Sequence, residues 1–334
     1  MRYERFRDNV KLSKLGLGAM RLPQTEPGFA GPIDESKARE MIDYCMQHGV
    51  NYYDTAYIYH GGKSEALLGR TLSKYPRDSF YMADKFNVQA NPDYEAQFSE
   101  QLNRLQTEYI DFYLLHGITD LTAGDYEACG CIPYFQEQKR MGKIKYLGFS
   151  FHGTPDCLRE LLKKNCWDFV QIQLNYYDWY QGTAKRQYEI LKEQGIPVMV
   201  MEPVHGGMLA GLPEELSKLE KISRMLRRKI AVPCTGCRYC CDNCPQGLDI
   251  PSLLSAYNDY RDEAAASGNS DMAIWRLLRL KALPEENILS LFPVLYYNGN
   301  REINTISGGD YAKENRYSQS TDHRIRPDHH RTGL

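Results

Sequence analysis

The sequence has no uninterrupted apolar run that approaches the roughly 20 residues needed to cross a membrane. Residues 1–8 carry charges where a signal peptide would have an apolar stretch. The formal net charge of -2 shows no excess of either sign, so neither nucleic acid nor an anionic membrane is expected as a partner. We therefore expect a soluble cytoplasmic protein.

The cysteines are not evenly distributed along the sequence. Of its ten cysteines, five are scattered through the first half and five lie between Cys234 and Cys244. A disulfide scaffold is short and rich in cysteine throughout, so this clustering favours metal ligands in a reducing compartment.

Short apolar strands alternate with amphipathic helices through the first 200 residues. After a hairpin over residues 3–14, we predict strands at residues 15–21, 50–56, 80–86, 110–116, 144–151, 169–174 and 196–201. Helices are predicted at residues 34–49, 64–75, 93–107, 126–141, 154–164 and 183–193. Strands that are apolar throughout are typical of parallel sheets buried on both faces.

Two α/β architectures have this alternation, an open doubly wound sheet and a closed (β/α)8 barrel. The Gly-x-Gly-x-x-Gly turn of dinucleotide-binding doubly wound sheets does not open the first helix. Polar residues also recur at nearly every strand end, where barrels place their chemistry. We therefore favour a TIM-barrel-like fold.

The alternation stops after Met208. A charged helix is predicted over residues 212–229, followed by the cysteine cluster and a helical stretch that ends near residue 283. We predict three regions: a barrel over residues 1–229, a cysteine-containing helical region over 230–283, and an irregular, partly disordered tail over 284–334.

Four strand-end residues suggest a general-acid site. Asp54 ends the second core strand and Tyr59 follows it, while Lys85 and His116 end the third and fourth. A phenol has a pKa of about 10, which a nearby ammonium lowers. Lys85 can supply that charge with Asp54 holding it, and His116 can orient a carbonyl oxygen. Singly, each residue is more often an ordinary loop or capping residue, but together the four predict a site that reduces a carbonyl.

Several motifs resemble those of the aldo-keto reductase family. They are Asp54-Thr-Ala-Tyr-Ile-Tyr59 with Ser64-Glu65, Ala83-Asp-Lys85, Tyr109-Ile-Asp-Phe-Tyr-Leu-Leu-His116, Lys145-Tyr-Leu-Gly-Phe-Ser150, Leu15-Gly-Leu-Gly18-Ala-Met-Arg21 and Met201-Glu-Pro-Val-His-Gly206-Gly207. The resemblance covers about residues 1–210. It implies a (β/α)8 barrel that binds NADPH or NADH without a Rossmann motif.

The resemblance also implies roles for single residues. Tyr59 would be the proton donor, Asp54 and Lys85 would tune its pKa, and His116 would place the carbonyl. Ser150 and Gln171 match positions that hold the nicotinamide carboxamide. Further coenzyme positions are Gly18, Met20 and Arg21 and, along the path of the pyrophosphate, Glu202, Pro203, Gly206 and Gly207. The family commonly has Asn after the serine, whereas this chain has Phe151-His152, which leaves His152 as a candidate substitute.

The cysteine run has the spacing C-x2-C-x2-C-x3-C-P of bacterial ferredoxins. We predict a [4Fe–4S] cluster held by Cys234, Cys237, Cys240 and Cys244, with Cys241 as an alternative ligand. Zinc is the alternative metal, because two CxxC pairs can form a tetrahedral site. No cysteine follows Cys244, so either four of these residues hold one cluster or three do and a ligand comes from elsewhere. The run resembles the ferredoxin-like extension of one aldo-keto reductase subgroup.

Two expected pieces are missing, the second ferredoxin cysteine motif and the eighth barrel unit. Only about 30 residues separate Pro203 from Cys234, where the family has the rest of its seventh unit and an eighth. Residues 230–232 and 302–307 are weak candidates for a replacement strand. We therefore predict a barrel that is incomplete after its seventh strand, and interpret the chain as a shortened reductase.

The leading functional prediction is an NAD(P)H-dependent oxidoreductase that reduces a small carbonyl or oxidises an alcohol. An iron–sulfur cluster would exchange electrons with a partner protein. Two alternatives stay open: a non-catalytic coenzyme- or redox-sensing module, and a cluster-bearing electron-transfer subunit.

Overall fold

A computed structural model describes residues 1–26, 31–210 and 247–267, together with 223, 230, 232, 234–236, 239–242 and 244. The chain divides into two compact units, Met1–Arg228 and Lys229–Leu334. Apart from Ser223, the helix predicted over residues 212–229 lies outside the described residues. So do the predicted tail, residues 268–283, and the stretch 302–307. The three-region division stays a prediction.

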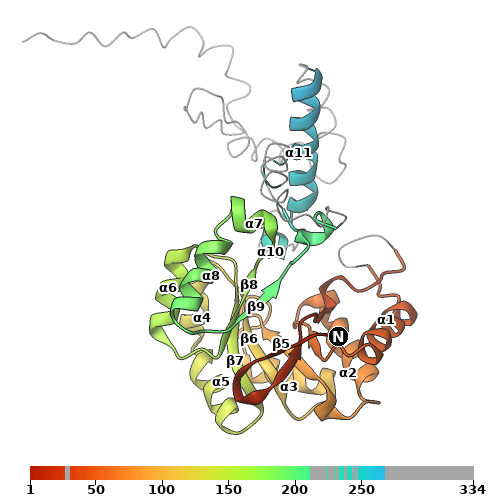
Figure 1. Ribbon diagram of the computed structural model, residues 1–334, viewed down its shortest axis with the longest axis vertical. Helices are drawn as coiled ribbons and strands as arrows, with labels where there is room; N and C mark the ends of the chain where they lie inside the picture. Colours follow the sequence, from red (N-terminus) through yellow and green to blue (C-terminus); the bar gives the residue numbers. More distant parts are fainter. Residues whose placement is uncertain are drawn as a thin grey trace, which may run out of the picture. The chain divides into compact units, whose positions relative to one another are not determined.

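Seven parallel strands form one curled sheet in the first unit (Figure 1). In order across the sheet they are β3 (Leu17–Gly18), β4 (Tyr52–Asp54), β5 (Tyr81–Phe86), β6 (Ile110–Ile118), β7 (Ile144–Phe151), β8 (Phe169–Gln173) and β9 (Val198–Met201). Spatial order equals chain order, as in a (β/α)8 barrel. Within the described residues the sheet ends at β3 and β9, which confirms the α/β class and the incomplete barrel.

The connecting helices cover the outer face of this sheet. They are α1 (Glu35–Gln47), α2 (Lys63–Leu72), α3 (Tyr94–Leu105), α4 (Ala123–Cys129), α5 (Cys131–Arg140), α6 (Pro155–Lys164), α7 (Tyr176–Gln181) and α8 (Ala184–Glu193). Asp34 caps α1 by accepting from Lys37 N. Thr154 caps α6 in the same way, with Pro155 in the first turn.

Two helix predictions were wrong in detail. The single helix predicted over residues 126–141 is two helices, because Gly130 adopts a left-handed φ of 69° between them. Helix α7 was not predicted at all. It begins where the Asn175 side chain accepts a hydrogen bond from Asp178 N, and its aromatic-rich sequence has no clear helical period.

The core has two layers, one between the sheet and the helices and one inside the curled sheet. The inner layer consists of Leu12, Tyr52, Ala83, Phe112, Leu114, Tyr146 and Phe169. The predicted N-terminal hairpin, β1 (Tyr3–Arg5) and β2 (Lys11–Ser13), brings Phe6 against it, with ring centroids 5.2 Å from Phe112 and 5.0 Å from Tyr146. The hairpin packs against the inner layer, whereas the polar strand-end residues lie at the carboxyl ends of the strands.

The second unit contains α10 (Tyr239–Asp242) and α11 (Ile250–Ser267). The Asn258 side chain on α11 donates to Val232 O at 2.8 Å and accepts from Val232 N at 2.9 Å. This pair of bonds ties the segment just before the cysteine run to α11. In the described part of the chain, no helix is long and apolar enough to cross a membrane.

Candidate active site

Polar side chains from successive strands meet at the carboxyl ends of the sheet. Lys85, His116, Ser150 and Gln171 lie one or two residues before the ends of β5, β6, β7 and β8 and are each no more than 4% exposed. Tyr59 follows β4 and is 8% exposed. These polar side chains are therefore held together in a site that is largely shielded from solvent, where their electrostatic interactions are stronger than in water.

Lys85 is the centre of this group. Its Nζ donates to Asp54 Oδ1 at 2.5 Å and to the carbonyl of Thr55 at 2.6 Å. The same Nζ lies 3.5 Å from the Tyr59 hydroxyl and 4.9 Å from the centroid of its ring. Parallel pairing of β4 with β5 brings these residues together, because Asp54 pairs with Ala83, two residues before Lys85. The ammonium thus touches both its counter-charge and the phenol.

Asp54 has a second partner that sequence reasoning missed. Its Oδ2 accepts a hydrogen bond from Gln171 Nε2 at 3.0 Å, which links β8 to β4. Gln171 Oε1 is buried and has no hydrogen-bond partner among the described residues. Such a buried acceptor is unfavourable unless a ligand satisfies it. Nearby, Ser150 Oγ accepts from Gly117 N at 2.7 Å.

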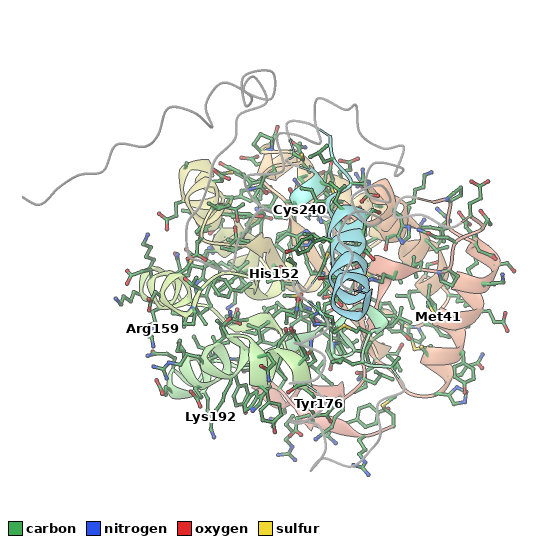
Figure 2. All side chains as sticks on the ribbon, turned by 90° about the horizontal axis from the view of Figure 1, so that it is seen from above. Met41, His152, Arg159, Tyr176, Lys192 and Cys240 are labelled. Atoms are coloured by element: carbon green, nitrogen blue, oxygen red, sulfur yellow. The ribbon has the colours of Figure 1, made fainter. Side chains whose placement is uncertain are left out.

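Two histidines are neutral at this site. Burial first, and then the neighbouring Lys85 ammonium and His152, hold the pKa of His116 well below its usual range. The His116 ring lies edge-on to Tyr59, with centroids 5.6 Å apart. Burial also lowers the pKa of His152 to about 4, against the opposing effect of the Glu202 and Asp178 carboxylates. Figure 2 looks onto this end of the barrel and shows His152 near its centre, while Arg159 and Lys192 lie on outer helices.

A polar cluster beyond β8 includes two residues, Gln173 and Asp178, that sequence reasoning missed. Asp178 Oδ2 accepts from Asn175 Nδ2 at 2.6 Å and Gln173 Nε2 at 2.8 Å, and lies 3.3 Å from His205 Nδ1. Burial alone would raise the pKa of Asp178, but these hydrogen bonds outweigh it and lower the pKa. The sequence signal that could have indicated this cluster is His205 directly before Gly206-Gly207, a polar residue at a glycine turn. In the structure His205 is buried.

The predicted coenzyme residues fall in two segments at the ends of the sheet. Gly18, Met20 and Arg21 follow β3, and Glu202, Pro203, Gly206 and Gly207 follow β9. Arg21 Nη1 donates to Glu202 Oε1 at 2.5 Å, so the two segments meet. A Cβ at Gly18 would meet no atom within 4 Å, which leaves open space beside this strand end.

The cysteine run is described only in part. Cys234, Cys240, Cys241 and Cys244 are not joined in disulfides within the described residues, and Cys237 lies outside the described residues. Two sulfurs accept backbone hydrogen bonds: Cys234 Sγ from Gly236 N at 3.4 Å and Cys244 Sγ from Leu248 N at 3.5 Å. Within the described residues, no three His, Cys, Asp or Glu side chains are grouped to hold a metal ion.

Comparison with known proteins gives the class that this fold and site define. Residues 14–270 match the model of the aldo/keto reductase family. The match covers more than half of the chain, and the chain belongs to this family. The predicted family resemblance is therefore confirmed, whereas the ferredoxin-like extension is not shown by these comparisons.

Individual relatives are distant. The chain is 28% identical over 212 residues to "Probable aldo-keto reductase 1" of Glycine max, which covers 60% of this chain and 58% of that protein. It is 29% identical over 218 residues to L-galactose dehydrogenase of Arabidopsis thaliana, and this match covers 61% of this chain and 66% of that protein. The chain thus spans about three fifths to two thirds of these relatives' length.

Among solved structures, the holo form of aldo-keto reductase AKR11C1 from Bacillus halodurans is similar, with a TM-score of 0.54 and 25% identity. The match covers 90% of this chain and 100% of that one. A second similar fold is the thermostable aldo-keto reductase Tm1743, with a TM-score of 0.53 over 68% of this chain and 81% of that one, at 22% identity.

Proposed function

We propose that this chain is an NAD(P)H-dependent oxidoreductase that reduces a small carbonyl or, in reverse, oxidises an alcohol. The observation that carries the proposal is the buried Lys85 ammonium, held by Asp54 and in contact with the Tyr59 hydroxyl. Relatives named L-galactose dehydrogenase and NADH-specific methylglyoxal reductase, the second from Escherichia coli and 24% identical, support this substrate class.

Tyr59 is the general acid of the proposed reaction. Its hydroxyl proton passes to the carbonyl oxygen as the alcohol forms, and the phenolate that remains lies beside the Lys85 ammonium. Asp54 keeps that ammonium in place. Neutral His116 can donate an N–H to the same oxygen, whereas a second cation there would repel Lys85. When bound, the reduced nicotinamide supplies the hydride.

The coenzyme would be held by the residues that end β7 and β8 and by the two end segments. Gln171 Oε1 is a buried acceptor without a partner in the described structure, and a carboxamide N–H can satisfy it. Ser150 lies on the neighbouring strand. The other positions we propose are Gly18, Met20, Arg21, Pro203, Gly206 and Gly207. Glu202 lines the same path of the pyrophosphate, and His152 is a further polar group of the site.

Changing Tyr59 to Phe tests the mechanism. Removing a general acid should lower kcat for a panel of small aldehydes by at least about 100-fold, while coenzyme affinity, measured by fluorescence titration, stays the same. Tyr57→Phe is the matched control, because the Tyr57 hydroxyl donates to Glu100 at 2.8 Å and not to the site. Unchanged turnover in Tyr59→Phe would exclude the proposed acid.

A non-catalytic coenzyme-sensing module is the second candidate. It is favoured by the described sheet ending at β3 and β9, where a full barrel has a further unit. Tight coenzyme binding with no turnover of any carbonyl by the unmodified chain would support the sensor and refute the reductase.

We also propose that Cys234, Cys237, Cys240 and Cys244 bind a [4Fe–4S] cluster that would pass single electrons to a partner protein. The spacing supports this, and so do the backbone N–H groups directed at two of the sulfurs, since such bonds tune clusters. The described cysteines form no disulfides, which fits a cytoplasmic location. Anaerobically purified protein should contain about four iron and four labile sulfide per chain; stoichiometric zinc without sulfide would refute the cluster.

A further inference from the structure

One ion pair joins the two ends of the curled sheet. Arg21 follows β3 and Glu202 follows β9, 181 residues later, and their side chains meet at 2.5 Å. The Glu202 side chain is only 10% exposed, while that of Arg21 is 43% exposed. A largely buried carboxylate is thus held at the rim by a cation that reaches solvent.

The turn after β9 is built around this carboxylate. Glu202 Oε2 accepts from Gly206 N at 2.7 Å, and the Glu202 carbonyl accepts from Asn175 Nδ2 and His205 N, each at 3.0 Å. Glu202 itself has a left-handed φ of 55°. This conformation is unfavourable for a non-glycine residue, and such strain persists only where surrounding contacts enforce it.

The donors on Glu202 are those that bind phosphate. A guanidinium and a backbone N–H in a turn of successive left-handed residues form an anion site. The turn continues with positive φ values at His205, Gly206 and Gly207. Phosphate sites of (β/α)8 barrels form in the loops after strands seven and eight, and β9 is the seventh strand of this sheet. A carboxylate of the chain itself sits in this site.

We propose that Glu202 competes with the phosphate groups of the coenzyme for Arg21 and the Gly206 N–H. Coenzyme binding then requires the carboxylate to leave these donors, and its return favours release. This inference rests on the proposed use of NAD(P)H. It makes Glu202 a determinant of coenzyme affinity, because a carboxylate and a phosphate repel each other within one small site.

The test is a coenzyme titration of Glu202→Gln followed by fluorescence, without turnover. Glutamine keeps the size and an acceptor for Gly206 N but has no charge. We expect the Kd for NADPH and NADH to fall about tenfold, which is about 1.4 kcal/mol. Arg21→Gln should raise the Kd. Glu35→Gln is the matched control, since it removes a carboxylate from exposed pairs with Arg39 on α1 and Arg70 on α2 and should not change the Kd.

Inorganic pyrophosphate separates this inference from the proposed function. Glu202→Gln should bind pyrophosphate at least tenfold more tightly than the unmodified chain. If that gain appears but neither protein binds a coenzyme, the anion site stands and the proposed reductase fails. If coenzyme binds but Glu202→Gln binds it no better, or more weakly, Glu202 is not a competitor and the inference is wrong. If the glutamine variant does not fold, Glu202→Ala replaces it in both titrations, with the same expected gain in affinity.

Discussion

Replacing Asp54 with Asn tests whether Lys85 is a buried cation. Lys85 is 1% exposed and Asp54 14% exposed, and their atoms meet at 2.5 Å. Asparagine keeps the shape and an oxygen acceptor for Nζ, and the Thr55 carbonyl remains at 2.6 Å. The substitution therefore removes the counter-charge and leaves the hydrogen bonds of the ammonium in place.

The expected cost follows from this geometry. Removing one partner of a buried ion pair usually destabilises a protein by about 3–5 kcal/mol, because the other charge is left uncompensated. Here the retained hydrogen bonds and the partial exposure of Asp54 place the loss at about 2–3 kcal/mol near neutral pH. Glu35→Gln breaks ion pairs whose partners are 42% to 50% exposed, and should cost below about 1 kcal/mol.

Urea unfolding at pH 7 measures this loss of stability. The chain has three tryptophans, of which Trp167 and Trp179 lie in Met1–Arg228. In a Trp275→Phe background, tryptophan fluorescence therefore reports only on the unit Met1–Arg228. An Asp54→Asn variant as stable as its parent would show that Lys85 does not carry a buried charge, and the proton-donor mechanism would lose its basis.

Two further predictions concern the helix layer. Burial, and then Glu65, hold the pKa of Asp84 well above its usual range, so folding takes up a proton and stability falls as pH rises above about 3.9. Asp84→Asn should flatten urea midpoints between pH 5 and 8; an unchanged slope would contradict it. A Cβ at Gly69 would lie 2.4 Å from Arg104 O, so Gly69→Ala should cost about 1–3 kcal/mol. A Cβ at Gly124 would meet no atom within 4 Å, so Gly124→Ala should be neutral or slightly stabilising. Equal urea midpoints for the Gly69→Ala and Gly124→Ala variants would refute the predicted clash at Gly69.

The strands and their order could be predicted because each is a short apolar run with a polar residue at its end. That pattern placed Lys85 and His116 at neighbouring strand ends, and parallel pairing brought them beside Asp54 and Tyr59. Helix α7 and the break at Gly130 depend on side-chain capping and a single left-handed residue, which leave little periodic signal.

Contacts across the barrel were harder to predict than those between neighbouring strands. Gln171 and Asp54 lie 117 residues apart, and nothing in either motif indicates that they share a hydrogen bond. The pairing of Asp84 with Glu65 has the same origin, because it depends on how α2 packs over the outer face of β5. Long-range polar pairs of this kind depend on curvature and packing and not on local pattern.

The position of the proton-donor group in the sheet bears on what an incomplete barrel loses. Asp54, Lys85 and His116 lie on the adjacent strands β4, β5 and β6, and Gln171 ties Asp54 to β8. Their geometry depends on strands that are fully paired. Arg21 and Glu202, in contrast, follow the two end strands. The described residues contain no eighth unit, and without one coenzyme binding should weaken before proton donation is disturbed. A poorly active chain should therefore recover rate at raised coenzyme concentration, with kcat preserved and KM for the coenzyme increased.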